Sequence, residues 1–135
     1  MRTANISQLF GTLQQSVVNS WKNHLKTSKY SAHMALDEYY KEMPELVDTI
    51  IENYQGIYGK IDDYENILDF NEDPIKYLGD LRDICVNSRG LLQQNTELES
   101  DMDNILTLID STLYKLKELT ESFVSLKDYI KENLE

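Results

Sequence analysis

The sequence predicts an all-α protein, a single four-helix bundle. Gly (5) and Pro (2) are scarce in the 135 residues, so little of the turn chemistry that separates short strands is present. Apolar residues recur three and four positions apart over long stretches, which is typical of helices with one buried face. The length suits one domain with one modest core. We therefore expect residues 1–135 to form one helical domain.

Two helices are predicted in the first half of the chain. The first runs from Ile6 to about Thr27, with Asn5 or Ser7 as its N-cap. The second begins at Ser31, which we expect to be the N-cap, and continues to about Tyr58. Pro44 falls inside the second helix, but the apolar face is the same on both sides of it, so we expect a kinked helix rather than two helices.

The second half of the chain predicts two more helices after a crossing segment. We expect a short helical turn within residues 62–73, and Asp73-Pro74 then has the form of a cap and a first turn. The third helix should run from there to about Asn95. The spacing of Thr96 and Glu99 is that of a capping box, and a heptad series of apolar residues follows it. We expect this fourth helix to run nearly to the C-terminus, through the extension Val124 to Glu135.

Charge and composition exclude several classes of function. The net charge of −11 disfavours direct DNA binding, since phosphate contacts require clustered Lys or Arg. Cys85 is the single cysteine, so no intrachain disulfide is expected, and no apolar run is long enough for a membrane span or a signal peptide. We expect a cytoplasmic protein. No phosphate loop or Ser/His/Asp arrangement indicates a nucleotide hydrolase or related enzyme.

A polar stripe on the second helix is the candidate functional feature. At about 100° per residue, His33, Asp37, Asp48 and Glu52 fall within about 100° of the helix circumference, away from the apolar face. His33 and Asp48 are separated by roughly 22 Å along the helix, so one chain cannot bring both to one metal ion. Two copies of this helix, antiparallel about a two-fold axis, would place His33 of one opposite Asp48 and Glu52 of the other. The pattern alone also fits a solvated acidic face, which is the commoner case.

The segment from His24 to Asp37, followed by Asp48 and Glu52, resembles the ferroxidase segment of the Dps-like mini-ferritins. That family has two histidines bracketing the turn between its first two helices, then an aspartate and a glutamate four residues apart. The resemblance implies a ferritin-like bundle, with His24 and His33 from one subunit and Asp48 and Glu52 from its mate as catalytic ligands of Fe(II)/Fe(III). Asp37 would be an auxiliary metal ligand. The stretch from His33 to Gly56 is also similar to small ferritin-like proteins of unknown role encoded by large bacteriophages.

Two functions follow from these observations and remain open at this point. The first is a Dps-like iron-binding protein, a ferroxidase that oxidises and stores iron for oxidative protection, as a homo-oligomer with a two-fold interface through the second helix and a dimer or closed shell as the assembly. The second is a metal-free helical bundle, a structural or virion assembly component that uses the same fold as a scaffold and has virion proteins as its partners. Whether the purified protein contains bound metal distinguishes the first function from the second.

Overall fold

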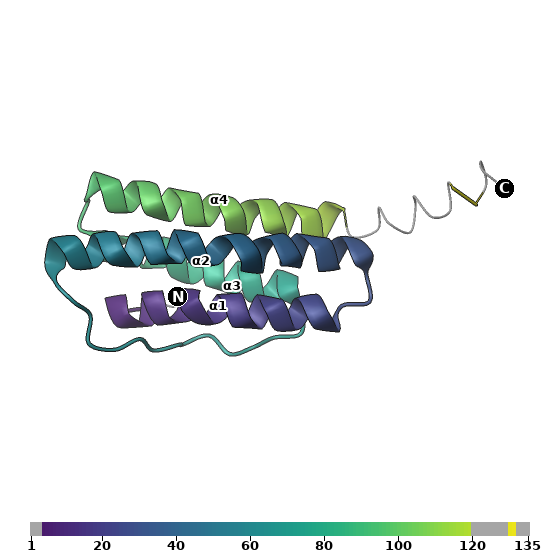
Figure 1. The fold of residues 1–135 in the computed structure, drawn as a ribbon, viewed down its shortest axis with the longest axis horizontal. Helices are drawn as coiled ribbons and strands as arrows, with labels where there is room; N and C mark the ends of the chain where they lie inside the picture. Colours follow the sequence, from purple (N-terminus) through teal and green to yellow (C-terminus); the bar gives the residue numbers. More distant parts are fainter. Residues whose placement is uncertain (1–3, 120–129, 132–135) are drawn as a thin grey trace.

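The computed structural model describes residues 4–119 and 130–131. These residues form an all-helical bundle (Figure 1). Its elements are α1 (Ile6–Lys26), α2 (Tyr30–Tyr58), α3 (Pro74–Asn87), a 3₁₀ helix η1 (Arg89–Leu92) and α4 (Thr96–Glu118). The predicted all-α, four-helix architecture is confirmed, and Pro44 lies inside the uninterrupted helix α2.

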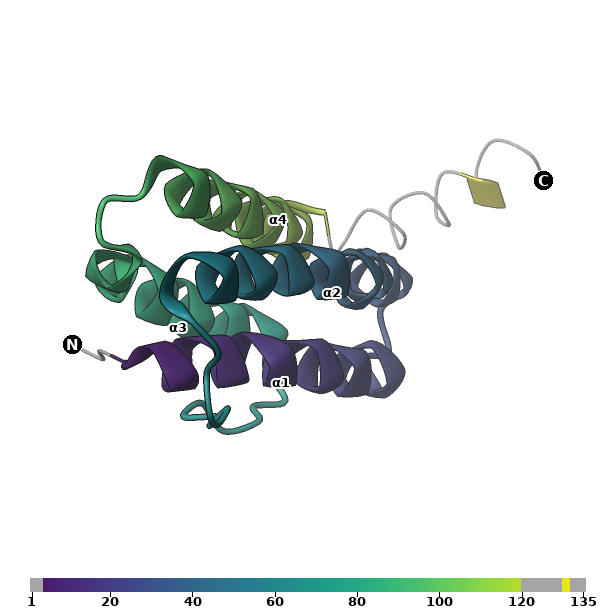
Figure 2. The same cartoon turned by 60° about the vertical axis from the view of Figure 1, so that its left-hand side comes forward.

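The four long helices are arranged so that each packs mainly on two neighbours. Helix α1 packs on α2 and α3, and α4 packs on the same two helices. Helices α1 and α2 are antiparallel, whereas α2 and α3 run in the same direction (Figures 1 and 2). A crossing segment, residues 59–73, therefore has to return along the whole length of the bundle, and it does so beside α1.

Local sequence explains most helix starts. The Asn5 side chain accepts a hydrogen bond from the Gln8 backbone in a complete capping box, so Asn5 rather than Ser7 caps α1. Asp73 caps α3 and is followed by Pro74, as predicted. Ser31 is not the cap of α2: that helix begins one residue earlier, and Lys29 precedes it with no side-chain capping bond. The prediction of a serine cap was wrong there.

The ends of the last two predicted helices also differ from expectation. Helix α3 ends at Asn87 and not near Asn95, because the chain turns into η1 and then enters the left-handed region at Gln93 and Gln94. That conformation cannot continue an α-helix. Helix α4 ends at Glu118, earlier than predicted. The extension Val124 to Glu135 lies outside the described residues except at positions 130 and 131.

The crossing segment contains no helix, so the predicted helical turn within residues 62–73 was wrong. Its backbone is bonded to α1 instead. The Glu65 amide donates to the Ser7 carbonyl at 3.2 Å, and the Ile67 amide donates to Thr12 Oγ1 at 3.0 Å. These long-range bonds satisfy backbone groups that a helical turn would have satisfied locally. Leu68 anchors the segment in the core, where it is 4% exposed.

The heptad series of α4 forms one side of the core. Its members are fully or almost fully buried in the described part of the series, namely Leu98, Met102, Ile105, Ile109, Thr112 and Leu116. The prediction that this seam is the inner edge of a bundle helix is confirmed for those residues. Leu119, which follows the last residue of α4, is 36% exposed.

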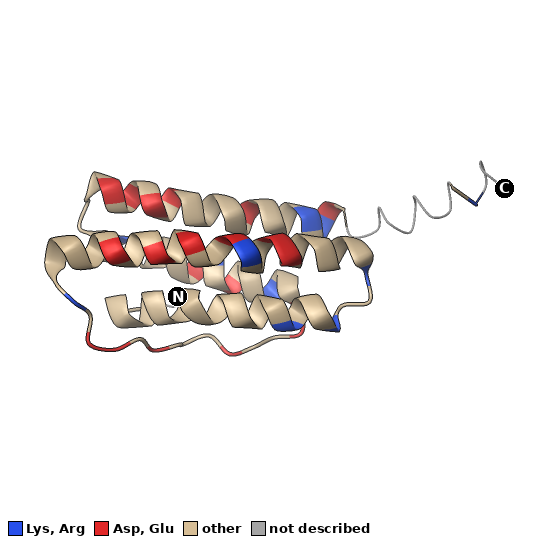
Figure 3. Ribbon diagram, in the orientation of Figure 1, with Lys and Arg blue, Asp and Glu red and all other residues tan. Residues whose placement is uncertain are grey.

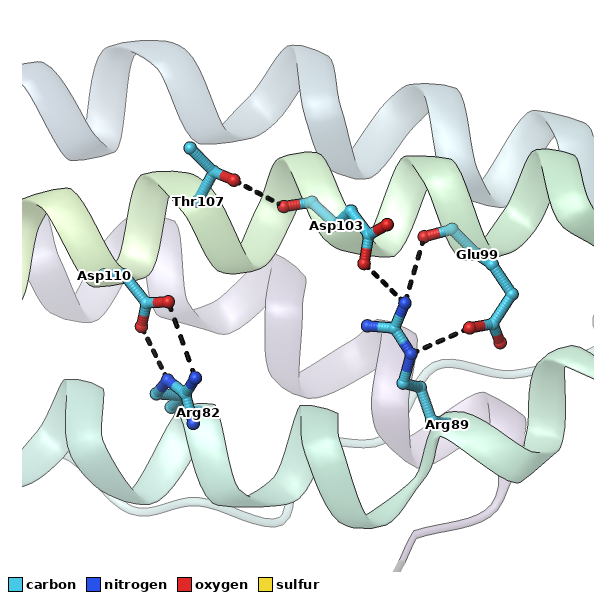
Figure 4. A network of polar contacts seen from close by, with 6 residues as sticks. All are labelled: Arg82, Arg89, Glu99, Asp103, Thr107 and Asp110. Atoms are coloured by element: carbon cyan, nitrogen blue, oxygen red, sulfur yellow. Dashed lines mark hydrogen bonds and ion pairs between the residues drawn. The ribbon is translucent and has the colours of Figure 1, made fainter.

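Two arginines fasten the α3 side of the bundle to α4 (Figure 4). Arg82 donates to the Asp110 carboxylate at 2.6 Å. Arg89 donates through Nε to Glu99 at 2.8 Å and through a terminal nitrogen to Asp103 at 2.5 Å. Such charge-assisted pairs fix the relative position of two elements more than they add to stability, because the groups are only partly buried.

The buried Cys85 thiol gives a direct probe of global stability. It is fully buried on α3, and burial raises its pKa to about 12, so little reactive thiolate is present at neutral pH. We expect a thiol reagent to label Cys85 in the native protein at least about 10³-fold more slowly than in the unfolded chain. Labelling with a chromogenic disulfide, with and without denaturant, checks this. A native rate equal to that of an unfolded thiol would contradict the burial of Cys85.

Candidate functional site

Two histidines meet where α1 turns into α2. His24 lies near the end of α1 and His33 near the start of α2, and their rings stack with centroids 3.7 Å apart and planes 21° from parallel. His24 Nδ1 lies 2.7 Å from the His33 carbonyl oxygen, and His33 Nδ1 lies 2.8 Å from the His24 carbonyl oxygen. A carbonyl oxygen can only accept, so both Nδ1 atoms carry a proton and donate. In the neutral form of either ring the lone pair is then at Nε2, the arrangement found in metal-binding histidines.

A carboxylate lies beside this histidine pair. Asp37, one turn after His33 on α2, has its Oδ1 4.0 Å from His24 Nε2. Lys41 Nζ lies 3.0 Å from the same oxygen and 3.1 Å from Oδ2. The hydrogen bond from Lys41 holds the pKa of Asp37 below its usual value, so this carboxyl is ionised at neutral pH. His24 is 6% exposed, and His33 and Asp37 are half-buried.

Aromatic side chains form one wall of the site. The Tyr40 ring meets His24 edge-on, with centroids 5.1 Å apart, and Trp21 stacks on Tyr40 at 5.6 Å. Trp21 remains 49% exposed. Its ring packs on Tyr40 on the outside of the α1–α2 pair rather than in the core.

The structure separates the remaining predicted ligands from this cluster. His24, His33 and Asp37 come together at one end of α2, whereas Asp48 and Glu52 are exposed further along the same helix. His33 and Asp48 are about 22 Å apart along the helix, as the spacing required. Among residues 4–119 and 130–131, no group of three or more His, Cys, Asp or Glu side chains is placed to hold a metal ion. Within one chain, the predicted ligand set is therefore incomplete.

An apolar groove of about 260 Å³ lies on the α1–α2 face, further along the two helices. Asp48 is one of its lining residues, so the groove leads to the separated carboxylates. The full lining consists of Gln14, Val17, Val18, Pro44, Val47, Asp48 and Ile51. Val18 is 41% exposed at its edge. The outer face of α1 and α2 thus carries the histidine pair, an exposed tryptophan, an apolar groove and then acidic side chains.

The interior of the bundle is polar at its centre but carries no carboxylate in the described part of the chain. Ser16 Oγ and the Tyr39 hydroxyl are 2.8 Å apart, and Asn19 donates to the Tyr77 hydroxyl at 3.1 Å. Burial raises the pKa of Tyr39, and that of Tyr77 to about 12, so both are neutral phenols. This network was not predicted from the sequence; its signal there is Ser16, a polar residue on the same helical face as Leu9 and Leu13.

Surface charge is distributed unevenly over the helices. Acidic residues follow the length of α2 and α4, whereas α1 contains no Asp or Glu (Figure 3). None of the helices in the described part of the chain combines the length and the apolar character that a membrane crossing requires.

The fold and the site define a helical-bundle protein with an imidazole pair at the first helix turn and a separate acidic stripe on the second helix. A family model matches residues 24–116, and its description reads "Family of unknown function (DUF5856)". The chain belongs to this family, since the match covers well over half of it and includes every candidate ligand from His24 to Glu52. No curated protein and no solved structure matches the chain.

Proposed function

We propose that this protein is a ferritin-like, Dps-like iron-binding protein with a ferroxidase-type site between two copies of the chain. His24 and His33 come from one copy, and Asp48 and Glu52 from the other. The observation that carries the proposal is the reciprocal bonding of the two rings to backbone carbonyls through Nδ1, which leaves Nε2 of each ring as the nitrogen that can bind a metal ion. A tautomer fixed in this way orients a ligand before any metal arrives.

The topology supports the ferritin-like part of the proposal. Ferritin-like bundles have one long connection, which lets the second and third helices run in the same direction. Residues 59–73 make such a connection here. The carboxylate-free interior in the described residues also disfavours an iron site inside one bundle, where carboxylates from several helices would have to converge. An iron site in this protein is therefore expected on the outside.

The proposed chemistry follows from the ligand types. Imidazole nitrogens and carboxylate oxygens together suit Fe(II), which is here the substrate. Two copies of α2, antiparallel across a two-fold axis, bring the histidine pair of each to the acidic stripe of the other and cover the apolar groove between them. Each Fe(II) loses one electron to dioxygen or hydrogen peroxide, and Asp37 is an auxiliary carboxylate. Assembly beyond the dimer, up to a closed shell in the cytoplasm, would retain the ferric product.

Replacing single ligands tests the site. We expect His33→Asn and Glu52→Gln each to weaken Fe(II) binding by at least about tenfold and to slow its oxidation in proportion. Asparagine keeps a donor near the position of Nδ1, so the bond to the His24 carbonyl can persist while Nε2 is lost. Anaerobic Fe(II) titration followed by oxygen addition measures both effects.

A matched control is available on the same helix. Glu42 is exposed on α2 but lies about 180° around the helix from His33, so Glu42→Gln removes one charge without touching the site. It should bind iron like the unmodified protein. Equal binding by all three variants and the unmodified protein would show that the ligand assignment is wrong.

One observation favours the metal-free alternative, a structural or virion assembly component. The two ring-to-carbonyl bonds already brace the α1–α2 turn, and Lys41 already neutralises Asp37. The cluster is thus satisfied without metal. Elemental analysis of the purified protein separates the two functions, because the alternative requires no bound iron and no iron uptake from solution.

A further inference from the structure

Lys41 forms an ion pair with Asp37, the carboxylate that lies beside the histidine pair. Its ammonium contacts both oxygens of Asp37, at 3.0 and 3.1 Å. One of these oxygens, Oδ1, lies 4.0 Å from His24 Nε2. A cation bound at His24 Nε2 would therefore lie close to Asp37 Oδ1, which already forms an ion pair with the Lys41 ammonium.

The lysine is held weakly enough to be displaced. Its side chain is 62% exposed, and Asp37 lies four residues earlier on the same helix. Ion pairs of this spacing on a helix surface contribute little to stability. The ammonium can swing into solvent and leave the carboxylate in place, since Asp37 itself is only 23% exposed.

We propose that Lys41 is the resident cation of this site: it keeps Asp37 directed at the histidine pair while no metal is bound, and it competes with an incoming divalent ion. The inference rests on the proposed function, because it assumes that His24 and Asp37 take part in metal binding. Lys41 then sets the concentration at which the site fills, and the bound ion replaces the ammonium as partner of Asp37.

The expected size of the effect follows from electrostatics. A unit charge roughly 6 Å from an incoming divalent ion changes its affinity by about tenfold where the effective dielectric constant is near that of water, about 80, and by less once the ammonium has moved further into solvent. Salt screens this repulsion, so the difference should shrink at high ionic strength. Folding stability should barely change when the lysine is replaced.

Isothermal titration with Co(II), which is stable to air oxidation in these ligands, tests the inference on the full chain. Lys41→Met should bind Co(II) about three- to tenfold more tightly than the unmodified protein, and Lys41→Arg should bind like it. Lys76→Met is the matched control, because Lys76 forms the same pair with Asp80 four residues later on α3, at 2.9 Å and with similar exposure, but with no imidazole beside it. It should leave Co(II) affinity unchanged.

Each result decides one of the two ideas. Equal affinity of Lys41→Met and the unmodified protein would overturn the role of Lys41 and leave the proposed function standing. Binding by Lys41→Met alone would support the competition and contradict iron binding by the natural chain. Absence of binding in every protein would remove the metal site, and the role of Lys41 with it.

Discussion

Replacing Gly11 with alanine is expected to destabilise the protein, although the same change inside a helix usually stabilises it. A Cβ at this position would lie 2.6 Å from the carbonyl carbon and oxygen of Glu65 and closer still to its nitrogen. The opposing group is backbone, and the Glu65 amide is tied to Ser7, so the crossing segment cannot yield without losing bonds. Helix propensity returns about 1 kcal/mol, but the overlap costs about 1–3 kcal/mol or more, and the detached segment adds to that cost.

Urea denaturation gives the sign of this effect. We expect Gly11→Ala to lower the free energy of unfolding by about 1–3 kcal/mol. Gly79→Ala is the control, because Gly79 lies inside α3 with open space around its Cβ position. That variant should gain about 0.5–1 kcal/mol. If Gly11→Ala is as stable as the unmodified protein, the close packing of the crossing segment on α1 is wrong.

Mixing two inactive variants is expected to restore iron oxidation. If the histidines and the carboxylates of one site come from different copies, a dimer of one His33→Asn and one Glu52→Gln chain has one site with both defects and one intact site. Random pairing makes about half of the dimers mixed, so about a quarter of all sites should be intact. Each variant alone has none. The expected increase in the iron oxidation rate is large, because the mixture has intact sites whereas each variant alone is almost inactive.

The experiment requires that the two chains exchange. Both variants are unfolded together, refolded, and assayed beside each variant refolded by itself and beside the unmodified protein taken through the same steps. Recovery to about a quarter supports a shared site. Recovery absent from the mixture, with full activity in the refolded unmodified protein, would contradict a site shared between two copies of the chain.

Much of the fold could be predicted because helix periodicity and capping are local properties. Asn5 and Asp73 were readable as caps, and the buried residues of α4 follow the heptad series. The conformation of the crossing segment could not be predicted, because it is set by hydrogen bonds to Ser7 and Thr12, more than fifty residues earlier in the chain. No pattern within the segment encodes those partners.

The candidate site was predictable in part for the same reason. Helix spacing correctly separated His33 from Asp48, and the short turn brought His24 to His33. The ring-to-carbonyl bonds depend on side-chain rotamers and on how closely two helices approach, neither of which a spacing argument provides. Asp37 and Lys41 are an acidic and a basic residue four apart, a spacing that indicates an ion pair on a helix, but this pair was not among the predicted features.

The crossing segment also changes what counts as the folding unit of this protein. It supplies a buried leucine, accepts no replacement of the helix glycine beneath it, and shares hydrogen bonds with the first half of α1. A connection of that kind is not a tether whose length can be varied freely at a small entropic cost. The crossing segment therefore packs as a fifth element of the bundle beside the four helices. It has no helix or strand of its own, and it contacts α1 on the side that the neighbouring helices leave uncovered.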